Sequence, residues 1–449
     1  IALLITTLFK DYSVESEMEL KKILTIFNKL IEIHSKENNH DNIARISLST
    51  GFTILMLIVF CKNPMELEKI SQKAINVVSN SWKLSKNSGN LQILILSLFL
   101  EASLLLVQNS FKNFQDKRRK QVHQNILSKA EESLKLAEDC RDSYIFSYLY
   151  FAIGIVKCEF AVHYIEDEIT QRNFIEKGIN FLEKGLIFAR EAKNRVLVIT
   201  ILFFLHRNAF ISGRFMYLQK RIINDLKEVE SAGLRFISLT RMYFFADFYA
   251  HYFPAFYYSN IAQMRFFTSS QRKSYAKKGI EYALKSLKIM IFETTYAVSF
   301  ISLTVSYAVL VRLATSEEEK RVNIEKMLEY AEKADILGEK YGGGDTRTMG
   351  YSAVYRAYKT LADISKSEKE KTNMLSKAID VSKKNLMHFS ESRTGIIVAQ
   401  MRLGLLYEEI GILTKDINTL MKAKDLILKS NKESNERGYH YYTATTYEY

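Results

Sequence analysis

Proline and glycine are scarce in this chain, which has two prolines and 17 glycines among its 449 residues. Both counts are far below ordinary usage, and both residue types interrupt helices and mark linkers. No proline-, glycine- or serine-rich stretch divides the sequence. We therefore predict one continuous helical-repeat domain over residues 1–449, not several domains joined by linkers.

Cysteine is rare as well, and the three residues (Cys61, Cys140 and Cys158) are too far apart and too few for a disulfide framework. Each lies in an apolar stretch, where a free thiol packs as a small hydrophobic group. This pattern favours a reducing compartment, and we expect a cytoplasmic protein. The sequence starts at Ile1 without signal-peptide features and stops at Tyr449 in an aromatic helical pattern. We expect a fragment of a larger polypeptide, whose other domains are candidate partners.

Signatures of catalysis and of cofactor binding are missing. The sequence has no phosphate-binding GxxxxGK[ST], no HExxH, no CxxC and no GxSxG motif. Its one glycine cluster, Gly342 to Gly344, separates two helical patterns and indicates a turn. His163 is followed by acidic residues, which we interpret as a solvated corner and not as a metal site. We expect no enzyme activity, no cofactor and no metal.

Uninterrupted apolar runs are too short or too polar for a membrane span. Residues 46–61 carry no charge but number only 16, and eight of the 18 residues 294–311 are Ser, Thr or Tyr. A membrane helix needs about 20 predominantly apolar residues. We predict no membrane span.

An internal repeat is the strongest feature that the sequence does contain. Seven segments carry two mostly small residues seven positions apart, which places them on one face of a helix. The first column holds Ala74, Ala130, Gly178, Gly279, Met327, Ala378 and Ala423, and the second holds Ser81, Ala137, Gly185, Ser286, Ala334, Asn385 and Ser430. A degenerate copy at residues 221–229 fills the one double step, so the period is about 50 residues.

Between these segments runs a second set of helical patterns, which are more apolar. Their apolar residues recur at spacings of three and four, as in an amphipathic helix. They cover residues 46–61, 91–107, 144–164, 196–211, 236–267, 294–313, 351–364 and 394–413. Neither kind of helix can bury its apolar face alone, and stacking supplies the core. The fold we predict is an all-α, right-handed α-solenoid of about eight antiparallel helix pairs.

The repeat resembles the tetratricopeptide family, in its long-helix variety from bacterial and archaeal signalling ATPases and sensors. The best copy has Leu403-Gly404 followed by Tyr407 on its first helix, and Ala423, Ile427 and Ser430 on its second. The copies depart from the family in their length of about 50 residues and in lacking its tryptophan and its closing proline. The resemblance implies a groove lined by first helices, which binds a protein partner.

The segment from Tyr243 to Phe267 is unusually aromatic, with 12 aromatic residues in 25. Aromatic side chains often dominate interfaces, although oversized core residues would give the same pattern. We expect Pro254 to kink or break the helix here. From the family's geometry we predict an aromatic pocket with one cation and one amide on the inner wall, built by Phe253, Phe256, Asn260, Arg312, Tyr351 and Tyr358.

The excess of basic residues, a net charge of +13, gathers in clusters that precede the second helices. Acidic residues such as Glu317 to Glu319 are interleaved with them, so we interpret these clusters as a solvated edge. Our leading hypothesis is a protein–protein interaction scaffold that binds a peptide, helix or partner domain in its groove. The alternative is a sensor that binds nucleic acid or a small ligand through the basic edge or the aromatic segment.

Overall fold

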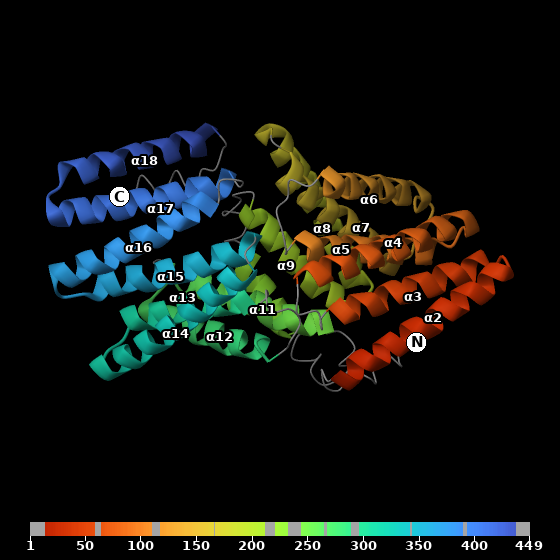
Figure 1. Ribbon diagram of the computed structural model, residues 1–449, viewed down its shortest axis with the longest axis horizontal. Helices are drawn as coiled ribbons and strands as arrows, with labels where there is room; N and C mark the ends of the chain where they lie inside the picture. Colours follow the sequence, from red (N-terminus) through yellow and green to blue (C-terminus); the bar gives the residue numbers. More distant parts are fainter. Residues whose placement is uncertain are drawn as a thin grey trace. The chain divides into compact units, whose positions relative to one another are not determined.

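The computed structural model describes residues 14–58, 64–109, 117–165, 167–211, 221–231, 244–264, 267–288, 296–341, 344–388 and 393–436. Over these ranges the chain is helical apart from short turns and forms no strand. The first half contains α2 (Val14–Lys36), α3 (His40–Ile58), α4 (Pro64–Ser88), α5 (Leu91–Asn109), α6 (Lys117–Leu136), α7 (Ser143–Tyr164), α8 (Glu168–Glu191) and α9 (Arg195–Ile211) (Figure 1). After a helix at residues 221–231 come α11 (Phe244–Ile261), α12 (Ser269–Ser286), α13 (Tyr296–Arg312), α14 (Glu317–Tyr341), α15 (Gly344–Ile364), α16 (Glu368–His388), α17 (Arg393–Thr414) and α18 (Ile417–Glu436).

The helices alternate in character, as the sequence predicts. The odd-numbered helices from α3 to α17 are the apolar ones, and we call them first helices; the even-numbered helices from α4 to α18 are charged on one face, and we call them second helices. Consecutive helices from α2 to α8 and from α12 to α18 pack against each other; in addition, α3 contacts α5, α5 contacts α7 and α13 contacts α15. The chain is therefore an all-α solenoid of helix pairs.

Contacts between Cα atoms divide the chain into two compact units. Unit 1 is Ile1–Ala209 with Glu228–Tyr249, and unit 2 is Phe210–Lys227 with Ala250–Tyr449. Within each unit, first and second helices form separate layers. The sequence predicts a single domain and one right-handed superhelix. Both depend on how the two units are placed relative to each other, so both stay predictions.

Both columns of small residues form the seam between the layers. All fourteen positions are buried, including the larger Met327 and Asn385. At Gly178 an added Cβ would lie 2.4 Å from the Cys158 sulfur and 2.9 Å from the Gly154 carbonyl oxygen. Even one methyl group is too much there, since protein interiors are close-packed. The seam that the repeat predicts is confirmed.

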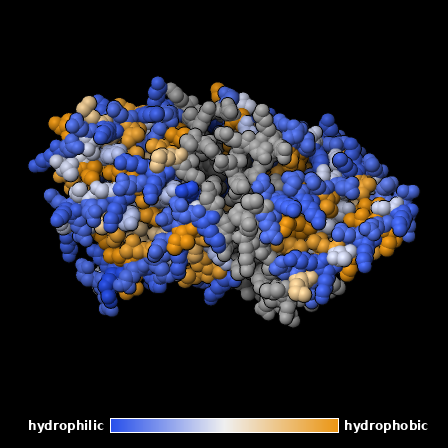
Figure 2. All heavy atoms as spheres, viewed as in Figure 1, coloured by the Kyte–Doolittle hydropathy of each residue, from blue (hydrophilic) through white to orange (hydrophobic). Residues whose placement is uncertain are grey.

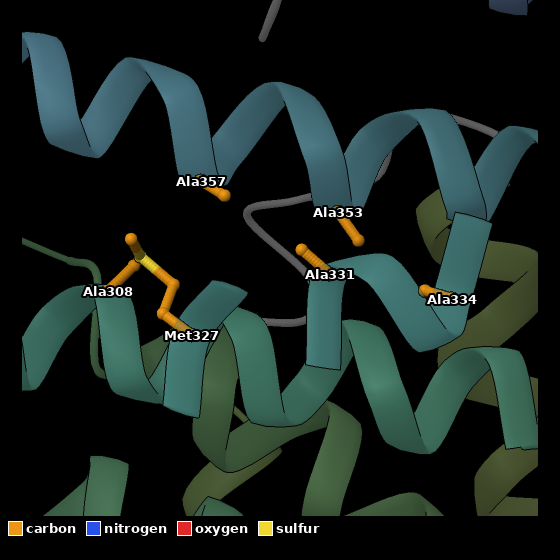
Figure 3. Close-up of a cluster of buried hydrophobic side chains, with 6 residues drawn as sticks. All are labelled: Ala308, Met327, Ala331, Ala334, Ala353 and Ala357. Carbon is orange, nitrogen blue, oxygen red and sulfur yellow. The ribbon is translucent and has the colours of Figure 1, made fainter. Parts of the chain in front are cut away.

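Where α13, α14 and α15 meet in unit 2, the seam is lined mainly by alanine. Ala353 and Ala357 of α15 face Met327, Ala331 and Ala334 of α14, and Ala308 of α13 completes the cluster (Figure 3). Small side chains let helix backbones approach closely, so neighbouring repeats stack tightly.

A column of N-caps marks the start of each first helix in unit 1, and the repeat analysis missed it. Asn39, Asn90, Asp142 and Asn194 each accept, through a side-chain oxygen, a backbone N–H from the first turn of the next helix. They are 51 or 52 residues apart in sequence. Three follow a residue with positive φ, which ends the preceding second helix (Asn38, Gly89 and Lys193).

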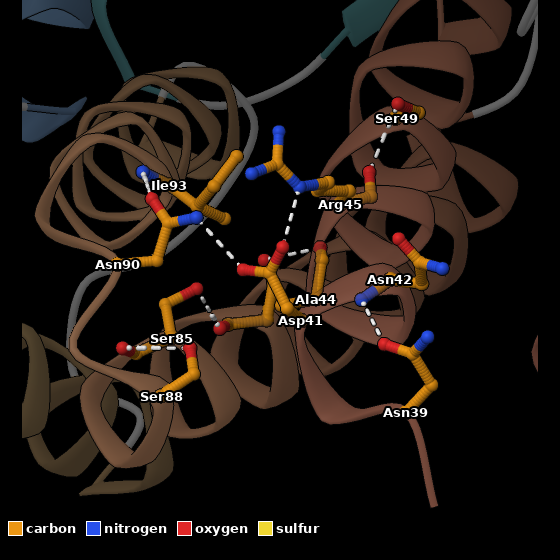
Figure 4. Close-up of polar contacts among 11 residues, drawn as sticks. Asn39, Asp41, Asn42, Ala44, Arg45, Ser49, Ser85, Ser88, Asn90 and Ile93 are labelled. Atoms are coloured by element: carbon orange, nitrogen blue, oxygen red, sulfur yellow. Dashed lines mark hydrogen bonds and ion pairs between the residues drawn. The ribbon is translucent and has the colours of Figure 1, made fainter. Parts of the chain in front are cut away.

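These caps also join neighbouring repeats. The Asn90 amide donates to Asp41 Oδ1 over 2.7 Å, and Arg45 Nε donates to the other carboxylate oxygen of Asp41 over 2.7 Å (Figure 4). These two hydrogen bonds, first that from Arg45, lower the pKa of Asp41. The Asn194 amide likewise donates to the Tyr148 hydroxyl.

The expectation that Pro254 breaks its helix is wrong, because α11 continues through Pro254, and a kink stays a prediction. Phe253, Tyr257 and Tyr258 are buried in unit 2, so the described part of this aromatic segment mainly builds core. The side chains of residues 244–250 lie outside the described residues.

One described helix has the length and hydropathy of a membrane span. It is α7, over Ser143–Val162, and two thirds of that window is buried inside the protein. A helix at the core of a repeat passes the same test of length and composition, so this one is weak evidence for a membrane.

Candidate binding face on unit 2

A small hollow opens on the first-helix layer of unit 2, between α13 and α15. We call it the α13–α15 hollow; its volume is about 130 Å³. It is lined by Gln263, Val305, Ala308, Arg312, Tyr355, Arg356, Lys359 and Thr360. Three of these eight residues are cations and none is an acid.

Arg312, the last residue of α13, is held across the repeat boundary. Its guanidinium donates to the Thr360 hydroxyl over 2.9 Å and to an Asp363 carboxylate oxygen over 3.0 Å. Both acceptors lie on α15. The two contacts fix the guanidinium at one end of the hollow.

Lys359 adds a second cation, one turn from Asp363 on α15. Its ammonium donates to Asp363 and, over 3.0 Å, contacts Glu409 of α17. Burial lowers the pKa of Lys359, but the hydrogen bond and charge of Asp363, followed by those of Glu409, outweigh burial and raise it. Lys359 therefore stays charged at neutral pH.

Arg356 reaches across α13 to the end of α11. Its guanidinium donates to the side-chain oxygen of Gln263, 93 residues earlier in the sequence. The Gln263 amide nitrogen faces the Ser259 carbonyl at 3.5 Å and Asn260 Oδ1 at 3.4 Å, which fixes the direction of the amide.

The cationic surface continues onto α17. Arg402 donates to the Ser352 hydroxyl over 3.3 Å, and its guanidinium lies 5.3 Å from the centre of the Tyr355 ring. A guanidinium at this distance from an aromatic ring is attracted to it. Arg312, Arg356, Lys359 and Arg402 thus give three successive first helices a common charge.

The six predicted site residues do not gather in one pocket. Arg312 lines the hollow, and Asn260 supports it through Gln263; the Asn260 amide itself donates to the Phe256 carbonyl over 2.7 Å. Phe253 is completely buried and packs on Tyr257. The structure therefore offers the cation and the amide that the sequence predicts, without Phe253 as an exposed ring.

The two remaining tyrosines lie toward the second helices. The Tyr351 hydroxyl accepts from Arg347 over 3.0 Å and donates to Glu339 of α14. Tyr358 packs on the cluster around Leu375 of α16, with Lys377 over its ring. Neither residue lines the hollow. The binding roles of all six residues stay predictions.

Sequence reasoning missed Gln263, Tyr355, Arg356 and Lys359. One signal was present: Arg312, Arg356 and Arg402 interrupt apolar helices at intervals of 44 and 46 residues, close to the repeat period. A cation that returns once per repeat in an apolar helix indicates a common face.

The basic edge is largely neutralised where the structure describes it. Lys273 pairs with Glu319 over 2.6 Å and Lys371 with Glu409 over 3.0 Å, each across a repeat boundary. Arg272 donates to the Ala262 carbonyl over 2.9 Å. The side chains of residues 117–119 and of Lys220 lie outside the described residues. These contacts favour a structural edge.

Other candidates also have structural partners. Arg207, which interrupts α9, forms an ion pair with the buried Glu159 of α7. Asp167, which belongs to the predicted acidic corner, caps α8 by accepting a hydrogen bond from the Thr170 N–H over 2.8 Å. Over the described residues, no three His, Cys, Asp or Glu side chains are grouped as they would be to hold a metal ion.

Hydrophilic residues cover most of the visible surface of each unit, with hydrophobic residues in patches between them (Figure 2). Large exposed apolar side chains occur mainly on second helices, such as Met387 of α16 and Met421 of α18. Scattered apolar residues are normal on a protein surface. The hollow is distinct from these patches because its polar groups converge.

Comparisons with known proteins add little to the description of the fold. No family model matches the chain, and no curated protein matches it. Among solved structures, it is similar to a circular tandem repeat protein with novel repeat topology and enhanced subunit contact surfaces, at 12% identity and a TM-score of 0.28. That alignment covers 94% of this chain and 91% of the other.

Proposed function

We propose that the chain is a protein-interaction scaffold that binds a segment of a partner protein on the first-helix face of unit 2. The observation that carries this proposal is the α13–α15 hollow, where Arg312, Arg356 and Lys359 converge on one cavity. A concave site with a few converging polar groups is the usual form of a binding site. Cations that are partly removed from water cost folding energy.

The scaffold is of tetratricopeptide type in this proposal, and it acts in cytoplasmic signalling. Support comes from the copy in α17 and α18, where a Cβ on Gly404 would lie 2.7 Å from the Ile427 side chain and 3.3 Å from the Ala423 carbonyl. In the family's pattern, Gly404 is the small residue of the first helix, and Ala423 and Ile427 are the small and the large residue of the second helix. Other domains of the same polypeptide are candidate partners.

A binding role without catalysis fits the chemistry of the hollow. Its lining includes no cysteine, histidine or carboxylate that could act as nucleophile or general base. Of its two hydroxyl-bearing residues, Thr360 and Tyr355, Thr360 accepts a hydrogen bond from Arg312. Arginine and lysine at such a site suit recognition of an acceptor group on a partner.

Selection from a random 12-residue peptide library tests the proposal. We expect the full chain to enrich a family of sequences, and an Arg312→Ala, Lys359→Ala double variant to lose that enrichment. A Lys333→Ala, Lys383→Ala variant, altered only on exposed residues of second helices, should retain it. No enrichment by the wild type, or equal enrichment by both variants, would reject this face as the binding site.

Nucleic acid is the competing ligand class for a cationic surface. The contacts of Lys273 and Lys371 with acidic residues speak against it. Binding of a labelled single-stranded RNA 30-mer distinguishes a nucleic-acid ligand from a peptide ligand. If the cationic surface binds RNA, the affinity must fall by orders of magnitude between about 50 and 200 mM salt. We expect the RNA to bind at neither salt concentration, whereas salt-dependent binding would favour nucleic acid as the ligand.

A further inference from the structure

The Gln263 side chain forms a strap over the first-helix face of unit 2. It starts just beyond the end of α11 and accepts a hydrogen bond from Arg356 of α15, so the two side chains together join segments that are two repeats apart. Ala308, the small α13 residue beneath, leaves the space that becomes the hollow. The strap therefore closes one side of the cavity with a single amide group.

The amide is oriented by its own neighbours. Its nitrogen is directed to the Ser259 carbonyl and to Asn260 Oδ1, and Asn260 is fixed by the Phe256 carbonyl. The oxygen is thus the atom turned toward Arg356. The group that faces the Arg356 guanidinium is therefore a neutral hydrogen-bond acceptor, the Gln263 side-chain oxygen, in a fixed position.

A carboxylate is the stronger acceptor for this guanidinium. Hydrogen bonds between ionised partners are roughly twice as strong as neutral ones, and a carboxylate can take both parallel N–H groups of an arginine. The charge near the hollow also favours an anion, because three cations (Arg312, Lys359 and Lys371) share two carboxylates, those of Asp363 and Glu409. A cavity of about 130 Å³ has room for several water molecules, and so for one carboxylate group.

We propose that the Gln263 amide holds the place of a partner's carboxylate on Arg356, and that an acidic peptide segment displaces it on binding. This inference rests on the proposed function, and it names the class of partner. Arg356 then binds the acidic side chain, Arg312 and Lys359 add long-range attraction, and Gln263 acts as a built-in competitor. The strength of that competitor sets the affinity for the acidic segment.

Two defined peptide pools and four proteins test the proposal. The pools are nine-residue peptides with random flanks and either Glu or Gln fixed at the centre, and their retention on the full-length immobilised protein is measured at 100 mM salt. Wild type should retain the Glu pool about tenfold better than the Gln pool, and Gln263→Ala should increase this ratio further. Gln263→Glu, which tethers a charged competitor, and Arg356→Gln should both bring the ratio near one.

The matched control is Arg321→Gln, which removes an exposed arginine from α14 and should leave the ratio at its wild-type value. Circular dichroism spectra check that every variant keeps its helices. Equal retention of the two pools by wild type, or opposite results for Gln263→Ala and Gln263→Glu, overturns the inference while the proposed function stands. If wild type retains neither pool, the proposed function fails together with it.

Discussion

Gly279 of α12 and Ser259 of α11 pack backbone against backbone: a Cβ on Gly279 would lie 3.1 Å from the Ser259 nitrogen. The same Cβ would lie 2.7 Å from the Ser306 hydroxyl of α13. Three helices from two successive pairs thus meet at one glycine. The contact shows that the stacked helices leave no space for a larger side chain at this point of the seam.

Enlarging this glycine should therefore destabilise unit 2. We expect Gly279→Leu to lower the free energy of unfolding by about 1–3 kcal/mol, because the added side chain has no space to enter. Lys277→Leu puts the same residue at an exposed position of the same helix and should stay within about 0.5 kcal/mol. Urea unfolding followed by circular dichroism measures both, and equal midpoints would show that Gly279 is not in a tight seam.

Removal of a repeated N-cap should weaken unit 1. Asn90→Ala loses the acceptor for the Ile93 N–H and the donor to Asp41, so we expect a loss of about 1–2 kcal/mol. Asn87→Ala, in an exposed part of α4, is the control and should change little. The single tryptophan, Trp82, lies on the same helix and reports unfolding by fluorescence. A normal Asn90→Ala midpoint would contradict a stabilising role for the cap column.

Acid should release the hydrogen bonds of Asp41. Its pKa is lowered in the folded protein, so its contribution to stability is present above the ordinary pKa of about 4 and is lost as pH falls below that value. We expect wild type to lose more stability than Asp41→Asn between about pH 5 and pH 3. Parallel losses in the two proteins would mean that Asp41 makes no net contribution.

A buried ion pair in unit 1 should be costly to break from one side. Glu101 is fully buried; burial raises its pKa, although Lys129, 2.6 Å away, counteracts this. Lys129→Met leaves that carboxylate without its cation, and we expect a loss of about 3–5 kcal/mol. Adding Glu101→Leu should recover most of that loss. A double variant no more stable than the single one would show that the pair contributes more than charge compensation.

The sequence predicts the fold through its small residues, since positions such as Ala130 and Gly178 must repeat wherever helices touch. It does not predict the binding site equally well. Whether a first-helix residue reaches the surface depends on which turns of that helix are covered by neighbouring helices. Phe253 and Arg312 follow from the same rule of spacing, yet Phe253 is core and Arg312 lines the hollow. The bond between Gln263 and Arg356 joins residues two repeats apart, beyond any local pattern.

Photo-crosslinking from single positions measures most directly whether the first-helix face of unit 2 is where a partner binds. The photoreactive phenylalanine derivative p-benzoylphenylalanine replaces either Tyr355, which lines the hollow, or Met387, which is 70% exposed on α16. Each protein is irradiated with the peptides that the wild-type chain retains. The account predicts crosslinks from position 355 and none from position 387. Crosslinks from 387 alone, or from both positions equally, would contradict it.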